Sequence, residues 1–205
     1  MSRGSAWHPE TEAGRLIALS DGIFSVAMTL AAVQVMPPDL NARLRAEGVG
    51  PLLSGLIPEF IAIAMTFLLV GMYWVSHHRM FTYIRRVDRP LLFLNLLFLL
   101  GITFMPFFVT ISLAEGPAAV AAYGAYIGAL GLLQILLWAY ATRHRRLIDA
   151  HLDAKIIRFN HYRALITSLV FFLSCPLAYY DTGWARLSWI LAVFNGRLAA
   201  ALADG

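Results

Sequence analysis

The sequence consists largely of long apolar runs that are separated by short polar segments. A helix that crosses the hydrocarbon core of a bilayer needs about 20 mostly apolar residues, and six runs approach that length. The pattern therefore predicts an all-α integral membrane protein with six transmembrane helices, folded as a single domain over residues 1–205. The expected helices cover 15–36, 52–76, 90–113, 117–142, 163–180 and 184–203.

The last of these runs differs from the others. Arg186 and Arg197 interrupt it, and the segment DTGW at 181–184 separates it from the fifth run. Charged side chains are costly within a membrane span. A sixth helix that is half inserted, or that lies at the membrane interface, is therefore an alternative to a full span.

The basic residues lie mainly in the segments that follow the second and fourth runs. Most of the 16 lysine and arginine residues fall in 77–89, in 143–163 and at the two ends of the chain. Cytoplasmic loops of membrane proteins are enriched in lysine and arginine. Both termini are therefore expected on the cytoplasmic side, and 143–163 is expected to extend the fourth and fifth helices.

The composition agrees with a membrane protein and argues against several other classes. Hydrophobic residues make up 60% of the chain and charged residues 14%, whereas soluble domains carry about 25% charge. The net charge of +4 lies between apolar runs with little aromatic interleaving. We therefore expect the basic segments to contact anionic membrane lipids and not nucleic acid. The sequence lacks a nucleophile–base spacing, an H-E-x-x-H motif and a phosphate-binding loop, so an enzyme is not expected.

The first run combines an apolar helix with a few polar residues. At 100° per residue, one narrow face of this helix carries a stripe of residues, most of them small or medium in size. The side chain of Asp21 points about 100° away from the middle of that stripe. Plain helix packing is the simplest explanation of the stripe. Its members are Arg15, Gly22, Val26, Thr29 and Val33.

Asp21 needs a partner or water, because an unpaired charge within a membrane span is costly. The expected partners lie at the end of the second run, where Trp74, His77, His78 and Arg79 reach the same depth. Two interpretations remain open. Asp21 is either an anchor that holds the first two helices together or part of a path for ions or protons, and we favour the anchor.

Two further patterns have structural explanations. His77 and His78 are adjacent, lack the spacing of metal ligands on a helix and have no cysteine or carboxylate cluster beside them. A hydrogen-bonded histidine is therefore expected here, not a zinc site. Gly124 and Gly128 form a G-x-x-x-G pair in the fourth run, which predicts close helix packing either within one chain or between chains.

Three segments resemble one known family. Arg15, Ser20 and Asp21 in RLIALSDGIFSVAMTL resemble the arginine-x-x-x-phenylalanine-serine-aspartate signature of the transmembrane protein 175 family of potassium channels. WVSHHRMF at 74–81 is similar to the end of the family's second helix, and NLLFLLGITFMPFF at 95–108 is similar to its third helix. Six spans with both termini inside also agree with the family.

The resemblance implies a particular assembly and a particular pore. Bacterial members are single six-helix chains that assemble as homotetramers in the inner membrane, and the first helices of the four subunits line the central pore. Ions pass a hydrophobic constriction, not a filter of backbone carbonyls. Aligned on the signature, the constriction falls at Val26, and a polar layer that contacts potassium transiently falls at Thr29. Val33 is placed to form a second apolar ring.

The resemblance also assigns a role to Arg15 at the start of the stripe and to the polar residues outside it. They would orient the first helix against its neighbours and would not meet the ion. If Arg15 faced the pore, it would bias the cytoplasmic mouth against cations, so we expect it to turn toward a carboxylate. This helix-orienting set is Arg15, Ser20, Asp21, Trp74 and His77 or His78.

Two positions depart from the family pattern. Leu19 stands where the signature has phenylalanine, which predicts a lost aromatic contact near Ser20 and Asp21. Val26 is smaller than the leucine or isoleucine that is usual at the constriction. Because hydrophobic constrictions gate by dewetting, a ring of valines is expected to hydrate more easily.

The leading hypothesis is a homotetrameric channel that conducts potassium passively, without a cofactor. The alternative is a proton-conducting protein or a secondary transporter that uses Asp21 and a histidine as a relay. A membrane scaffold that conducts no ions is a third possibility. Ion flux in liposomes with potassium as the only driving ion discriminates among the three.

Overall fold

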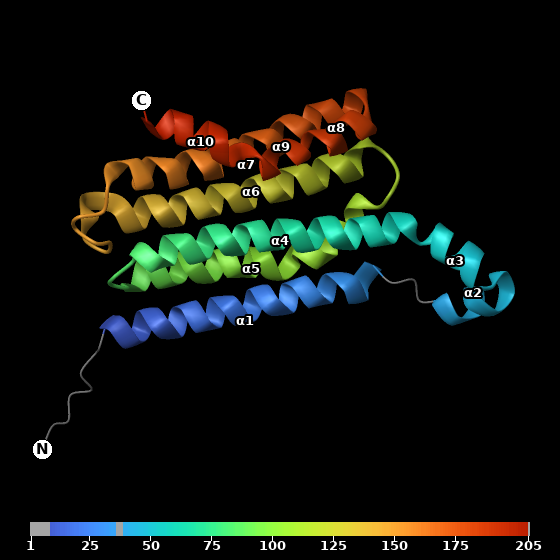
Figure 1. Cartoon of the computed structure of the whole chain (residues 1–205), viewed down its shortest axis with the longest axis horizontal. Helices are drawn as coiled ribbons and strands as arrows, with labels where there is room; N and C mark the ends of the chain where they lie inside the picture. The colour runs from blue at the N-terminus through green and yellow to red at the C-terminus, as the bar shows by residue number, and fades with distance from the viewer. Residues whose placement is uncertain (1–8, 36–38, 205) are drawn as a thin grey trace, which may run out of the picture.

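The computed structural model describes residues 9–35 and 39–204, and these residues are almost entirely helical. The long helices run side by side along the longest axis of the molecule (Figure 1). They are α1 Pro9–Val35, α4 Ile57–Tyr83, α5 Arg89–Ser112, α6 Pro117–Thr142 and α7 Ala154–Tyr180. The shorter elements are α2 Leu40–Glu47, α3 Val49–Gly55, η1 Arg143–Arg145, α8 Thr182–Ser188, α9 Ile190–Val193 and α10 Asn195–Asp204.

The packing order of the helices places α1 at one edge of the molecule. α1 packs against α4 and α5, α6 packs between α5 and α7, and α10 packs on α7. Figure 1 shows α1 along one margin and α8 to α10 along the opposite margin. In the part of the chain that the structure describes, one long face of α1 is therefore exposed.

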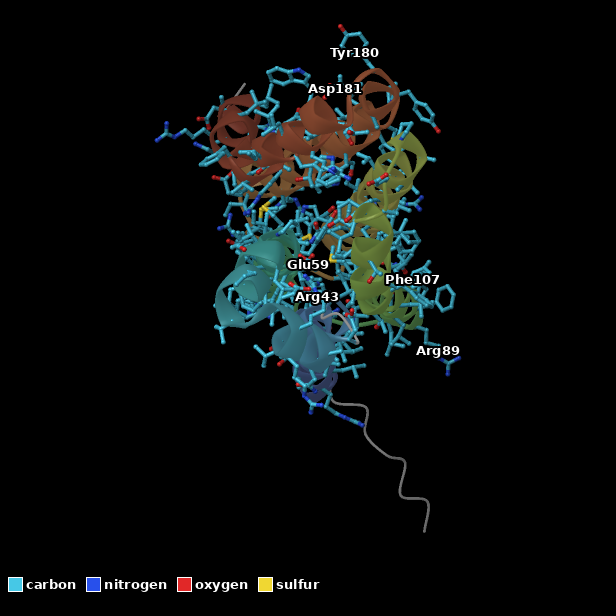
Figure 2. All side chains as sticks on the ribbon, turned by 90° about the vertical axis from the view of Figure 1, so that its right-hand side faces the viewer. Arg43, Glu59, Arg89, Phe107, Tyr180 and Asp181 are labelled. Carbon is cyan, nitrogen blue, oxygen red and sulfur yellow. The ribbon has the colours of Figure 1, made fainter. Side chains whose placement is uncertain are left out.

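Within the described residues, five helices are long and apolar enough to cross a membrane, and a sixth is reached if the last helices act as one span. The chain is therefore a multi-pass membrane protein. Phe107 shows the character of the outer surface, since it projects from α5 away from the bundle and is 54% exposed (Figure 2). The same view places Arg43 and Glu59 near the middle of the picture, and Tyr180 and Asp181 at its upper margin.

Two of the predicted spans agree closely with the structure. The spans expected at 90–113 and 117–142 are α5 and α6, each within one residue at both ends. The first span begins earlier than expected, because the polar residues before Arg15 are also helical. Its expected end at Met36, with the two prolines that follow, lies outside the described residues.

The second and fifth helices differ in extent from the predicted spans. The second helix begins at Ile57, not at 52, because Pro58 fits the first turn of a helix and not its interior. It runs on to Tyr83, since Met80 and Phe81 are buried beyond the apolar run. The fifth begins at Ala154, where the side chain of Asp153 accepts a hydrogen bond from the backbone of Lys155. The apolar run alone did not predict this start, because the first turns of α7 contain polar residues.

The 143–163 segment and the last run also differ from their expected form. Residues 143–163 extend only the fifth helix, because the backbone leaves helical geometry at His144 and Arg145, both with positive φ. The single helix expected at 184–203 is three short helices, and Thr182–Val193 meets Asn195–Asp204 at an angle of 54°. The last run is thus broken into short helices, and its half-inserted or interfacial placement stays a prediction.

The G-x-x-x-G pair of α6, Gly124 and Gly128, packs closely against α7 of the same chain. A Cβ added at Gly124 would lie 3.0 Å from the carbonyl oxygen of Phe171, and one added at Gly128 would lie 3.0 Å from the ring of Phe172. Gly131, one turn on, faces Ser168 in the same way. The contact is therefore made within one chain.

The helix ends form a cluster of positive charge at one end of the bundle, which we call the basic end. α1 and α7 begin there, and α4 and α6 end there, so the 84–88 and 143–153 connections lie together. Leu147 accepts backbone hydrogen bonds from Arg85 and Arg86, which join the two connections. Arg85 and Asp149 add an exposed ion pair at 3.6 Å. The backbone N–H of His151 and the charge of Arg85 lower the pKa of Asp149.

Candidate functional site

α1 has one buried face and one open face. The side chains of Leu16, Ser20, Phe24 and Ala27 are at most 5% exposed. Their spacing of four, four and three residues places them on a single side of the helix. This side faces α4 and α5, so it fixes the rotation of α1 about its own axis.

The open face carries the stripe that the sequence singled out. Val26 is 55% exposed and Val33 is 69% exposed, and Gly22 and Thr29 are exposed between them. Arg15 lies exposed at the start of the same face. The structure thus brings the stripe together along one surface of the chain. The role of Val26, Thr29 and Val33 as a pore lining stays a prediction, since the single chain encloses no channel through them.

Thr29 is oriented by its own helix. Its hydroxyl donates to the carbonyl oxygen of Val26 at 3.0 Å and also lies 3.2 Å from that of Ser25. Because its one proton is used in this way, the remaining lone pairs of Oγ1 are left to face outward. An exposed oxygen in this state is suited to contact a cation.

A buried chain of hydrogen bonds joins α4, α5 and α1. His77 Nε2 lies 2.7 Å from Asn95 Oδ1, and Asn95 Nδ2 donates to Ser20 Oγ at 3.2 Å. Ser20 in turn donates to the carbonyl oxygen of Leu16 at 2.8 Å. Because the amide oxygen of Asn95 accepts, Nε2 of His77 carries a proton. Three helices are therefore held by side chains that are at most 2% exposed.

Asp21 has a separate partner. Its Oδ1 accepts a hydrogen bond of 2.8 Å from Trp74 Nε1, which links α1 directly to α4. His78 lies beside Trp74, with ring centroids 5.5 Å apart. Arg79, also considered from the sequence, makes no ion pair with Asp21. The predicted pairing of Asp21 with the end of the second helix is found, and its partner is a neutral indole.

Aromatic rings pack around the hydrogen bonds of His77, Asn95 and Ser20. The ring of Phe24 lies 5.5 Å from that of His77 and 6.1 Å from that of Phe98. The ring of His77 stacks on Phe81 at 4.2 Å. These rings exclude water from the Asn95 hydrogen bonds, which makes each bond more costly to break.

Two features of this region were missed or misplaced by the sequence. Asn95 was not singled out, although it is a lone amide within an apolar run and such a residue needs a buried partner. Leu19, at the phenylalanine position of the signature, is 46% exposed on the open face. The expected loss of an aromatic contact beside Ser20 and Asp21 stays a prediction. Leu19 instead lines a shallow apolar groove with Thr103 of α5.

Among residues 9–35 and 39–204, no three histidine, cysteine, aspartate or glutamate side chains are grouped to hold an ion. Nε2 of His77 is occupied by Asn95. The adjacent histidines instead take part in stacking and hydrogen bonding.

Comparison with known proteins covers this same region. A family model described as the endosomal/lysosomal potassium channel TMEM175 matches residues 15–106, which include α4 and most of α1 and α5. A relative from Streptomyces collinus, named a potassium channel, is 36% identical over 178 residues, which cover 82% of this chain and 83% of that protein. The chain belongs to the TMEM175 family. TMEM175 is a family of ion channels, which confirms that the chain is not an enzyme.

Other TMEM175 relatives differ in length and in name. A protein from Chamaesiphon minutus, named a potassium channel, is 33% identical over 182 residues, covering 82% of this chain and 89% of that protein. The human relative, named an endosomal/lysosomal proton channel, is 25% identical over 185 residues, covering 87% of this chain but 36% of that protein. The crystal structure described as a lysosomal potassium-selective channel TMEM175 homologue from Chamaesiphon minutus matches with a TM-score of 0.77. It is 22% identical and covers 92% of this chain and 98% of that one, so it shares the fold.

Proposed function

We propose that the chain forms a homotetrameric channel that conducts potassium passively through a central pore lined by α1. The carrying observation is the division of α1 into two faces. The buried face is locked by Ser20 and Phe24, while Val26, Thr29 and Val33 are exposed on the open face. An exposed apolar and hydroxyl stripe within a membrane helix is expected to meet lipid, another subunit or water, and four such stripes around an axis enclose a pore.

The bacterial relatives named potassium channels support potassium as the permeant ion. In this proposal Val26 forms the constriction and Thr29 supplies transient oxygen contacts to potassium. No cofactor takes part. The chain would lie in the bacterial inner membrane with the basic end, and so both termini, in the cytoplasm.

The size of the side chain at 26 tests this assignment. Because a wider ring wets more easily, Val26→Ala should raise potassium flux into proteoliposomes several-fold, and Val26→Leu should lower it. Thr29→Ala should reduce the preference for potassium over sodium. Leu100→Ala, at an exposed position on α5, is the matched control and should leave flux unchanged. If potassium flux is unchanged in both Val26 variants, the assignment of the constriction is wrong.

Proton conduction is the second candidate, and the vertebrate relatives named proton channels favour it. The described contacts give it no continuous relay. The chain from His77 ends at the carbonyl of Leu16, and the amide of Asn95 within it does not pass protons as a hydroxyl or imidazole does. Asp21 is bonded to Trp74 instead.

Replacing the carboxylate separates the two functions. Asp21→Asn keeps an oxygen acceptor for Trp74 and removes the titratable group. A potassium channel should retain potassium flux without a proton gradient in this variant. A relay protein should lose proton movement and keep its fold, as judged by pH-sensitive dye in the same liposomes.

A further inference from the structure

Two arginines, Arg79 of α4 and Arg163 of α7, lie near the basic end without an acidic partner among the described residues. Arg79 contacts α7 at Phe159, and Arg163 follows one helical turn further along α7. Neither guanidinium takes part in an ion pair or hydrogen bond in the part of the chain that the structure describes. Arg79 lies over the ring of Phe159, 5.5 Å from its centre. Two adjacent positive charges in a membrane helix bundle are costly unless something negative lies between or beside them.

Arg163 is held at its depth by a polar cavity behind it. Asn195 donates to the carbonyl oxygen of Arg163 at 3.1 Å and to Thr167 Oγ1 at 2.6 Å. The cavity has a volume of about 20 Å³, enough for one water molecule. Gln134 Nε2 and Asn195 Oδ1 lie buried beside it without a protein partner. The backbone of Arg163 is therefore fixed, and its side chain lies at a built polar site.

In front of Arg163 lies a large apolar groove between α1 and α4. Its volume is about 670 Å³, and most of its wall is aliphatic or aromatic, including Met28, Phe67, Leu68 and Val75. Arg163 lines one end of it. Asp21 also lies on the α1 wall, where Trp74 occupies one of its oxygens.

The face of α4 continues this groove to the basic end. Leu68, Met72, Val75, Arg79 and Tyr83 are spaced by three or four residues and share one side of the helix. Leu68 and Arg79 are about 16 Å apart along the axis at 1.5 Å per residue, about half of the ~30 Å hydrocarbon core. A second hollow of about 220 Å³ lies beside Arg79 and contains Tyr83 and Lys155. The groove and this hollow follow one another along the face of α4, apolar at Leu68 and Val75 and basic at Arg79 and Lys155, and we call the two together the slot.

We propose that this slot binds one anionic phospholipid from the leaflet on the basic side. The phosphate lies between Arg79 and Arg163, and an acyl chain follows the groove past Val75 toward Leu68. Guanidinium groups bind phosphate oxygens through paired charged hydrogen bonds, which neutralises the two like charges. The proposal concerns the outer surface of α4 and does not depend on the pore assignment.

Native mass spectrometry of the full chain with phosphatidylglycerol and phosphatidylcholine tests the site. The intact protein should retain one phosphatidylglycerol per chain in preference to phosphatidylcholine. Arg79→Gln with Arg163→Gln should weaken that binding about tenfold or more, because it removes the charged hydrogen bonds to the phosphate. Val75→Trp, which fills the groove and keeps both charges, should weaken it too, whereas inorganic phosphate should not compete.

Two matched variants control for charge and bulk. Arg86→Gln with Arg143→Gln removes two exposed charges from the same end of the bundle, and Leu100→Trp adds bulk on α5. Both should leave phosphatidylglycerol binding unchanged, with all variants matched by size-exclusion profile. Equal binding in the Arg79/Arg163 variant, or equal loss in the charge control, overturns the proposal. So does efficient cross-linking of Val75→Cys between chains in a Cys175→Ser background, because a neighbouring subunit then fills the groove.

Discussion

At Asn95, one amide satisfies polar groups from two other helices. It accepts from His77 of α4 and donates to Ser20 of α1. Ser20, Asp21 and Trp74 could be identified as candidate residues from the sequence, because polar or charged groups are rare in or beside an apolar run. Their hydrogen-bond partners could not be predicted, since the pairing depends on how three helices are rotated against each other. Asp21 was thus matched to the correct helix, while the link from Ser20 through Asn95 to His77 was missed.

Removing the amide should weaken the junction of the three helices. Asn95→Leu keeps a similar volume and leaves the buried N–H of His77 without an acceptor, at a cost of about 1–3 kcal/mol. A lower thermal unfolding midpoint in detergent is expected. Asn41→Leu, at an exposed position of α2, is the control and should change the midpoint little. Equal midpoints for the two variants would show that the junction contributes nothing to stability.

Among the helices, the rotation of α1 follows from sequence periodicity, whereas the ends of α4 and α7 and the pairing of α6 with α7 do not. The rotation of α1 was predictable, because the stripe and the polar residues separate on a helical wheel. The ends of α4 and α7 were not, because buried or capped polar residues extend both helices beyond their apolar runs. The partner of the glycine pair was also open, since close approach needs a second helix that the sequence alone does not identify.

A methyl group at Gly124 should force α6 and α7 apart. The new Cβ would lie 3.0 Å from a backbone oxygen of Phe171 and 2.7 Å from Ser174 Oγ, and such overpacking costs about 1–3 kcal/mol. Gly124→Ala is therefore expected to lower the unfolding midpoint in detergent. Gly14→Ala in α1, where nothing lies within 4 Å, is the helical control. A midpoint for Gly124→Ala as high as that of the control would contradict close packing at this point.

At the scale of the whole molecule, the single chain leaves the open face of α1 uncovered. The hydrogen bonds of Ser20 and Asp21 turn the other faces of α1 toward α4 and α5, so the open face can point only away from the subunit's own bundle. Four chains that bring these faces together would convert an exposed stripe into a pore. In such a tetramer Asp21 would orient the helix, and Val26, Thr29 and Val33 would contact the ion.

Thiol accessibility of Val26 tests this claim most directly. In a Cys175→Ser background, Val26→Cys is reconstituted from a sample whose native mass is four times the 22.7 kDa of the chain. We expect a water-soluble thiol reagent to block potassium flux through this variant, and to leave flux unchanged in Leu100→Cys on the outer face of α5. Potassium flux that continues in Val26→Cys after complete labelling would contradict a pore lined by α1.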